Sequence, residues 1–351
     1  MVIAASRSAR VAGRLTMVEP RWQAWWREVC AGVDAGAAPG VSTWVSVRGE
    51  VVVDAVHGLA QSEPTPIPLT PELRFDLASV TKALSTTLCV MALVEDGRLD
   101  LDRPVAGALT PRLLLTHQSG LPAHRLYYQT CADRDDVRRA VLHTGPETTP
   151  GTFVVYSDVG FLRLGFLTEE LTNQRQDEWL RARLLGPAGV ADALGYGPLP
   201  PEQAVATERC LLRGLVIRGE VHDENAWRCD GVAGHAGLFG TAAAVGRFTQ
   251  ALVRGEVLAP ATLTQMLAVR HDHAGERFLL GWKRLSYDTE DTMAFGHDGF
   301  TGCLVWVAPR WDLVLVLLTN RVHPSRDNRL IYDLRPDWVR HAARLAAGQT
   351  P

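Results

Sequence analysis

Residues with strand character gather near both ends of the chain, and this distribution constrains the fold more than any other feature. The stretch "VSTWVSVRGEVVVDAVHG" is rich in β-branched residues on either side of Arg48-Gly49-Glu50, which predicts a hairpin. Near the other end, "CLVWVAP" and "LVLVLLTN" flank "RWD" and predict a second, strongly apolar hairpin. The simplest architecture that unites them is an α+β fold, in which one antiparallel β-sheet built from both termini is flanked by helices and carries an inserted, mostly helical region.

The length of 351 residues is enough for two compact lobes. We therefore expect a sheet domain formed by residues 19–78 together with 271–351, and an inserted, mainly helical region over 79–270. The active site is expected between them. Residues 1–18 are expected to form a disordered tail, or the chain has its true start at Met17; their short apolar run, followed at once by arginines, does not resemble a secretory signal.

Three helices follow from the hydrophobic pattern. "EPRWQAWWREVCAGVDAG" has helical spacing and predicts a helix over about 20–34, and a last helix is expected over about 336–347. From Ser79 to Asp96 the chain is apolar on nearly every side, and Gly97 supplies a stop. That segment is expected to be a helix buried all round.

The bulk composition excludes several classes of protein. A net charge of -3 gives no electrostatic reason to expect nucleic acid or an anionic membrane as partner. No run approaches the roughly 18 apolar residues of a membrane span, and nothing at the start looks like a secretory signal, so we expect a cytoplasmic protein. The six cysteines show no CxxC spacing and predict no disulfide framework; Cys89 and Cys303 are expected in the core. The oligomeric state stays open.

Lys82 is one of only two lysines in a chain with 34 arginines, and it stands in an apolar run. Ser79 lies one helical turn before it, on the same face. A buried lysine with a depressed pKa can take the proton of a serine, and the first N–H groups of the helix can hold an oxyanion. With 11 serines and two lysines, one such spacing arises by chance at odds of about 6%. The alternative is a capping Ser79 with an incidental lysine, which does not explain a lysine in an apolar run.

A second element is "VVYSDVGFLRLGFL". Tyr156 could pass a proton to a leaving group, and Asp158 could orient Lys82 or the substrate. The alternative is a plain helix start, with Ser157 or Asp158 as N-cap and Tyr156 in the core.

A third element is "FGHDGFTGCLVWVAP", where Gly296, Gly299 and Gly302 would let another backbone or a ligand approach a strand closely. His297 and Asp298 lie beside that opening. A single histidine in such a place is usually structural, so this element carries weight only together with the other two.

Five ordered segments resemble the serine β-lactamase / penicillin-binding-protein superfamily, in particular its class C, D-alanyl-D-alanine carboxypeptidase and esterase branch. They are "LASVTKALSTTLCVMALVEDGRLDLDRPV", "LLLTHQSGLP", "YSDVGFLRLG", "DGVAGHAGLFGTAAAVGRF" and "GHDGFTGCLVWVAP" with "VLVLLTN", and they run in order from about residue 41 to 322. The "VHDENA" to "GVAGHAGLF" stretch resembles cell-wall-related members and is expected in a loop near the cleft.

The resemblance implies roles for single residues. Ser79 matches the acylated nucleophile, Lys82 its partner, and Tyr156 the tyrosine of the Y-x-N element. His297-Asp298-Gly299 match the K-T-G element, which implies an oxyanion hole formed by the Ser79 and Phe300 N–H groups. Asp158, His297, Asp298 and Gly299 are then expected to bind substrate.

Two residues depart from the family pattern. Asp158 stands where many members have Asn, and His297 stands where β-lactamases have Lys. The second change is expected to leave the site without a permanent cation for the carboxylate of a β-lactam. Both changes favour ester or amide substrates over β-lactams.

The function expected from these residues is a serine hydrolase that cleaves a small-molecule or short-peptide ester or amide through a Ser79 acyl-enzyme, with no metal or organic cofactor. Alternatives are an acyltransferase, a true β-lactamase or DD-carboxypeptidase, and a catalytically silent peptide-binding homologue. A metallohydrolase is a distant alternative, because "HDH" at 271–273 and "VHDEN" at 221–225 complete no zinc pattern and are expected in loops or at the surface.

Overall fold

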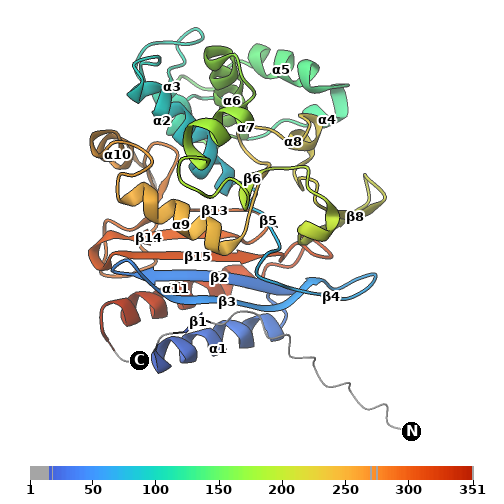
Figure 1. The fold of residues 1–351 in the computed structure, drawn as a ribbon. Coiled ribbons are helices and arrows are strands. Elements are labelled where there is room, and N and C mark those ends of the chain that lie inside the picture. Colours follow the sequence, from blue (N-terminus) through green and yellow to red (C-terminus); the bar gives the residue numbers. More distant parts are fainter. Residues whose placement is uncertain (1–15, 18, 269–270, 274–275, 350–351) are drawn as a thin grey trace.

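The computed structural model describes residues 16–17, 19–268, 271–273 and 276–349. Its centre is an antiparallel sheet of ten strands within that described part, in the order β1-β3-β2-β15-β14-β13-β12-β11-β10 with β4 beside β3 (Figure 1). The expected α+β fold, with one sheet assembled from both ends of the chain, is confirmed. The strands of this sheet are β1 (Thr16–Met17), β2 (Gly40–Val47), β3 (Glu50–Gln61), β4 (Ile67–Pro68), β10 (His271–His273), β11 (Glu276–Phe278), β12 (Lys283–Arg284), β13 (Phe295–Asp298), β14 (Leu304–Ala308) and β15 (Leu313–Thr319).

The two predicted hairpins form the middle of this sheet. β2 and β3 pair around the turn at Arg48 and Gly49, and β14 pairs with β15. β15 then pairs with β2 from Leu313 opposite Val47 to Thr319 opposite Val41, which joins the two ends of the chain. Both faces of β15 are buried, because helices cover the sheet on either side.

Alternation along β15 assigns its residues to the two faces. Leu313, Leu315 and Leu317 pack with α1 (Pro20–Asp34) and α11 (Leu330–Ala346) in one hydrophobic cluster. Val314, Val316 and Leu318 belong to a second cluster with α9 (Ala242–Val253) and the helical region. Successive strand residues point to opposite faces, so a strand covered on both sides is apolar throughout. Figure 1 shows α1 below the sheet and α9 above it.

The helical region lies on the α9 side of the sheet (Figure 1). It also contains short strands, which the sequence did not predict. The small strands are β5 (Phe75–Asp76), β6 (Leu194–Tyr196) and β9 (Leu238–Gly240) in one sheet, and β7 (Ala206–Cys210) with β8 (Leu215–Arg218) in another. The remaining helices are η1 (Lys82–Thr87), α2 (Leu88–Glu95), α3 (Pro111–Leu115), α4 (Tyr127–Thr130), α5 (Arg134–His143), α6 (Asp158–Thr172), α7 (Gln176–Leu180), η2 (Arg181–Leu185), η3 (Pro201–Gln203), α8 (Glu224–Arg228), α10 (Pro260–Leu267) and η4 (Pro309–Trp311).

The helix predicted from Ser79 is present, and its residues from Val80 to Leu93 are all buried, whereas its last turn reaches the surface. Its first part, η1, is a π-helix, and α2 continues it to Glu95. All residues of η1 are buried, and Gly97 follows the end with a φ of 69°. π-Helical turns are rare and are frequently found at functional sites.

Two boundaries differ from the sequence prediction. Within the expected tail over 1–18, residues 1–15 and 18 lie outside the described residues, but Thr16–Met17 form β1 and pair with β3. The last helix begins at Leu330 instead of 336 and contains Pro336, because the buried Ile331 fastens its first turn to the core. The division between a sheet domain and the region 79–270 stays a prediction.

All six cysteines are free thiols, and Cys89 and Cys303 are fully buried as expected. Within the described residues, no helix combines the length and the apolar character that crossing a bilayer requires. His271–His273 form strand β10 instead of the expected loop.

Candidate active site

Ser79 directly follows a strained turn. Ala78 has a φ of 46°, in the left-handed region that costs an L-residue roughly 1–2 kcal/mol. The Ala78 N–H donates to the Asp76 carboxylate at 2.8 Å, which holds the turn in place. Asp76 is buried, and burial raises the pKa of its carboxyl. Strain of this kind persists where the surroundings enforce it, most often at functional sites.

Lys82 and Ser79 contact each other as their spacing predicted. The Lys82 Nζ donates to Ser79 Oγ at 2.8 Å and to the His235 carbonyl oxygen at 3.4 Å. It also lies 2.8 Å from Asp158 Oδ1. The lysine side chain is completely buried, so these hydrogen bonds and the ion pair with Asp158 replace the water that cannot reach the ammonium group.

The ionisation of Lys82 is the reverse of what we expected. Burial by itself lowers the pKa of this lysine, but the Asp158 carboxylate and the Tyr156 hydroxyl outweigh it, and the net pKa is raised above the ordinary value. Burial also opposes the charge on Asp158, yet the Lys82 ammonium lowers the pKa of that carboxyl well below its usual range. The two groups therefore form an ion pair at neutral pH, and the expectation of a depressed Lys82 pKa was wrong.

Asp158 has a second basic neighbour, His124. Its Nδ1 lies 3.5 Å from Asp158 Oδ2, and the hydrogen bond to this carboxylate raises the pKa of His124. Ser157 is the N-cap of α6, accepting from the Gly160 N–H at 3.0 Å. The capping interpretation is thus confirmed for Ser157, whereas Asp158 contacts Lys82.

Tyr156 lies near two lysine ammonium groups and two histidine rings. The Nζ atoms of Lys82 and Lys283 each lie 4.8 Å from the centroid of its ring. The ring of His117 is 4.4 Å away between centroids and that of His297 is 6.1 Å away. Sequence reasoning found Lys82 and His297 but not Lys283 or His117.

His117 holds the segment that carries Tyr156. Its Nδ1 accepts a hydrogen bond from the Ser157 N–H at 3.0 Å, and its carbonyl accepts one from the Val155 N–H at 2.8 Å. Burial, and then the nearby Lys82 charge, lower its pKa well below 6.5. His117 is therefore neutral, with its proton on Nε2. No local pattern near His117 predicts this role, because the contact joins residues 40 positions apart.

The third predicted element, which contains Gly299 and Thr301, packs against the turn that precedes Ser79. A Cβ on Gly299 would come 2.5 Å from the Leu77 carbonyl oxygen, so only glycine allows this approach. The Thr301 hydroxyl donates to the Asp76 carbonyl at 2.8 Å and fastens the same junction. Within the described residues, neither the Ser79 N–H nor the Phe300 N–H donates a hydrogen bond, so both are available to an oxyanion.

His297 is neutral at pH 7, because it is buried and lies near the positive charge of Lys283. Burial, followed by the charge of Lys283, lowers the pKa of His297 to about 3. Its Nδ1 contacts the Asp298 carbonyl oxygen at 2.8 Å. Asp298 pairs with Lys283 at 3.2 Å and with Arg335 at 3.4 Å. The expectation that the site lacks a permanent cation was wrong, because Lys283 on β12 supplies one beside β13.

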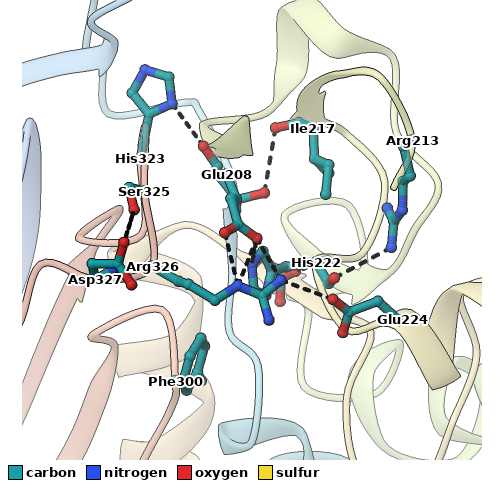
Figure 2. A network of polar contacts seen from close by, with 12 residues as sticks. Glu208, Arg213, Ile217, His222, Glu224, Phe300, His323, Ser325, Arg326 and Asp327 are labelled. Carbon is teal, nitrogen blue, oxygen red and sulfur yellow. Dashed lines mark hydrogen bonds and ion pairs between the residues drawn. The ribbon is translucent and has the colours of Figure 1, made fainter. Parts of the chain in front are cut away.

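Phe300 is supported by a network of charged side chains, shown in Figure 2. Its ring stacks on that of His222 with centroids 5.7 Å apart. The His222 Nε2 contacts Glu208 Oε2 at 3.0 Å, and Glu208 accepts from the Arg326 Nε at 2.7 Å. Arg326 also bonds Glu224 at 2.8 Å. His222 lies in a loop, one of the two places expected for it, although its side chain is buried and not at the surface. The "VHDEN" segment lies beside the site as expected, since His222 stacks on Phe300.

The described residues contain no group of three or more His, Cys, Asp or Glu side chains arranged to hold a metal ion. The arrangement offers a serine hydroxyl on an ammonium, a tyrosine beside the same ammonium, and two backbone donors. Such a set suits acyl transfer to a serine.

Comparison with known proteins supports this chemistry. A family model described as Beta-lactamase matches residues 26–336. An N-acetylmuramyl-L-alanine amidase of Bacillus subtilis is 29% identical, covering 85% of this chain and 79% of its own length. A putative D-alanyl-D-alanine carboxypeptidase of Escherichia coli K12 is 26% identical, over 85% of this chain and 81% of its own.

Solved structures share the fold. A penicillin-binding protein homologue from Caulobacter crescentus has a TM-score of 0.75 at 20% identity, covering 94% of this chain and 98% of its own. A D-amino acid amidase from Ochrobactrum anthropi has a TM-score of 0.72 at 19% identity, covering 92% of this chain and 99% of its own. The resemblance inferred from five sequence segments is thus confirmed.

Proposed function

The chain belongs to the beta-lactamase family, and from this premise we propose that it is a serine hydrolase that cleaves an amide or ester bond through an acyl-enzyme on Ser79. One observation carries the proposal. The Ser79 hydroxyl is 2.8 Å from the ammonium of a fully buried lysine that is itself ion-paired. Burying a charge costs free energy even when the charge is paired, and buried ionisable groups with shifted pKa values cluster at functional sites.

The proton steps follow from the charge on Lys82. An ammonium cannot accept the Ser79 proton, so Lys82 donates a hydrogen bond that orients Oγ. Tyr156 bonds the same ammonium and, as phenolate, accepts the proton while Oγ bonds the substrate carbonyl carbon. The carbonyl electrons move to oxygen, where the Ser79 and Phe300 N–H groups receive them.

Collapse of this intermediate expels the leaving group. The carbonyl reforms, the bond to the amine or alcohol breaks, and Tyr156 returns its proton to the departing atom. A water molecule then attacks the acyl carbon and gives one proton to Tyr156. The second tetrahedral intermediate collapses, the bond between Oγ and the acyl carbon breaks, and Tyr156 returns that proton to Oγ, so that Ser79 leaves as the alcohol and the acid is released. The cycle restores every group without a redox change.

The substrate class is a small-molecule or short-peptide amide, with esters as reactive surrogates. The names of the relatives support amides, since one is an N-acetylmuramyl-L-alanine amidase and others are putative D-alanyl-D-alanine carboxypeptidases. Asp158 and the segment from His297 to Gly299 would line the substrate site. Because Lys283 supplies a permanent cation, the site has a group that can pair with the carboxylate of a β-lactam.

A neutral fluorophosphonate probe tests the proposal. We expect one adduct per chain, located on the peptide that contains Ser79, and none in Ser79→Ala. The same proteins should be assayed with N-acetylmuramyl-L-alanine, D-amino acid amides, p-nitrophenyl esters and nitrocefin. Labelling that persists in Ser79→Ala would exclude Ser79 as nucleophile.

A further inference from the structure

Arg321 is a buried arginine beside the candidate oxyanion hole, and its charge is not balanced by a carboxylate. It lies two residues after the end of β15 and is 1% exposed. The ionisable groups that act on it are Tyr332, Arg329 and Arg335, two of which are cations. In the part of the chain that the structure describes, no aspartate or glutamate forms an ion pair with it. Burying a cation without a counter-ion costs free energy, which its hydrogen bonds must offset.

The hydrogen bonds of the Arg321 guanidinium go to backbone carbonyl oxygens. Its Nε donates to the Phe300 carbonyl at 2.7 Å, and its Nη1 donates to the carbonyls of Arg326 at 2.8 Å and Asn328 at 2.6 Å. The backbone N–H of Arg321 donates to the Thr301 carbonyl at 3.2 Å. One residue therefore holds the carbonyl groups of two consecutive residues, Phe300 and Thr301.

These two residues form the tip of the turn between β13 and β14. The Gly302 N–H donates to the Gly299 carbonyl at 2.9 Å and closes the turn. The peptide groups at the tip lie outside the strand ladder, so contacts from elsewhere in the fold must fix their orientation. The Phe300 N–H is one of the two donors assigned to the oxyanion, and its direction depends on that orientation.

The ring of Phe300 is held as well, although this residue is 46% exposed. The Arg321 Cζ lies 4.5 Å from the ring centroid, and the His222 ring stacks on it at 5.7 Å. His222 and Arg326 belong to one charged network, in which both contact Glu208 (Figure 2). Burying only half of a phenylalanine gains little hydrophobic stabilisation, so these contacts are better explained by the position that they give to the Phe300 backbone.

We propose that Arg321 is a positioning residue for the oxyanion hole: its guanidinium fixes Phe300 so that the Phe300 N–H faces the carbonyl oxygen of a substrate bound at Ser79. The inference rests on the proposed acyl-enzyme. A lysine at position 321 would keep the charge but lose the planar fork that binds several carbonyl oxygens in fixed directions.

A matched pair of substrates isolates the contribution of the oxyanion hole. One is a p-nitrophenyl ester, and the other is the thionoester with the same acyl and leaving groups, in which sulfur replaces the carbonyl oxygen. Sulfur is a weak hydrogen-bond acceptor, so the thionoester gains little from the two N–H donors. In Arg321→Lys, we expect kcat/KM for the ester to fall by about 10- to 100-fold and kcat/KM for the thionoester by less than about threefold.

The matched control is Arg163→Lys. Arg163 is also buried, and its Nη2 donates to three backbone carbonyls, those of Val141, Leu142 and Thr144. Its replacement should lower stability while leaving the ratio of ester to thionoester rates at the wild-type value.

A second variant keeps the test valid if circular dichroism shows that Arg321→Lys does not fold. Phe300→Ala removes an exposed ring and leaves the hydrogen bonds of Arg321 in place. The same selective loss for the ester is then expected, by about three- to tenfold.

The outcomes separate this inference from the proposed function. Wild-type protein that hydrolyses neither substrate and is not labelled at Ser79 by a fluorophosphonate would overturn the acyl-enzyme and this inference with it. If Ser79 is labelled, an equal loss for the ester and the thionoester would refute the role of Arg321 in the oxyanion hole. Wild-type rates for both substrates in Arg321→Lys would refute it too, because the charge alone would then suffice.

Discussion

Replacing Asp158 by Asn tests the ion pair on which the proton steps depend. The substitution keeps an oxygen near Lys82 Nζ, now 2.8 Å from the carboxylate, and removes only the charge. Lys82 is completely buried, so its ammonium would lose its counter-charge without gaining water. We expect a large loss of stability at pH 7.

The magnitude can be bounded from both sides. Breaking a buried ion pair by removing one partner costs about 3–5 kcal/mol. The loss cannot much exceed the cost of taking the proton off an ordinary lysine at pH 7, which is about 5 kcal/mol. Because Asn keeps a hydrogen-bond acceptor, we expect the free energy of unfolding to fall by about 3 kcal/mol.

The pH dependence has a defined sign. In the wild type, the pKa of Lys82 is raised and that of Asp158 is lowered, so the pair stabilises the fold fully between about pH 5 and 9. In Asp158→Asn, burial lowers the pKa of Lys82, and the unfolded chain then binds the extra proton. Stability of the variant should therefore rise with pH, by at most about 1.4 kcal/mol per unit, up to about pH 10.

Urea unfolding of both proteins between pH 6 and 10 provides the assay. The matched control is Asp192→Asn, whose carboxylate pairs with Arg181 but is 98% exposed, and which should unfold like the wild type. An Asp158→Asn protein as stable as the wild type, with the same pH dependence, would show that Lys82 does not depend on Asp158.

Three further substitutions test other parts of the account. Gly299→Ala places a Cβ 2.5 Å from the Leu77 carbonyl oxygen and should displace the Phe300 N–H, which would lower the rate of Ser79 labelling about 100-fold. The control is Gly145→Ala, which has open space around it and should label at the wild-type rate. Equal rates for the two variants would show that the Phe300 N–H is not part of the oxyanion hole. His297→Gln removes a histidine whose pKa is about 3 in the folded protein, so that the unfolded wild-type chain binds more protons than the folded protein between pH 6.5 and 3. Acid should therefore destabilise the variant less than the wild type over this range. Urea midpoints that fall in parallel for the two proteins would contradict a neutral, buried histidine. Gly234→Ala places a Cβ 1.9 Å from the Phe161 carbonyl oxygen and should lower the free energy of unfolding by about 1–3 kcal/mol. The control is Gly195→Ala, where no atom lies within 4 Å of the added Cβ. An unchanged urea midpoint for Gly234→Ala would show that the segment containing His235 does not pack this tightly on α6.

Local pattern was enough to predict the elements whose neighbours in sequence are their neighbours in space. The helix Pro20–Asp34, both hairpins and the contact of Ser79 with Lys82 are of this kind. Each depends on periodicity or on one helical turn. The resemblance then placed Tyr156 and His297 in the same site, and their rings lie 6.1 Å apart.

The predictions that were wrong concerned contacts between segments that are distant in the sequence. The sign of the Lys82 pKa shift is set by a carboxylate on α6, which no spacing near Lys82 reveals. No permanent cation was expected, because position 297 is histidine where β-lactamases have lysine. Instead, Lys283 on β12 pairs with Gly296 in the sheet and places its ammonium 4.8 Å from the centroid of the Tyr156 ring. The one usable signal for Lys283 was the rarity of lysine in the sequence.

The central claim, an acyl-enzyme on Ser79, is tested most directly by rapid-quench kinetics with a p-nitrophenyl ester. We expect a burst of about one equivalent of nitrophenol per chain, together with a mass increase of one acyl group on the peptide that contains Ser79. Neither signal should occur in Ser79→Ala. Turnover without a burst and without a Ser79 adduct, or an adduct mapped to another residue, would contradict the account.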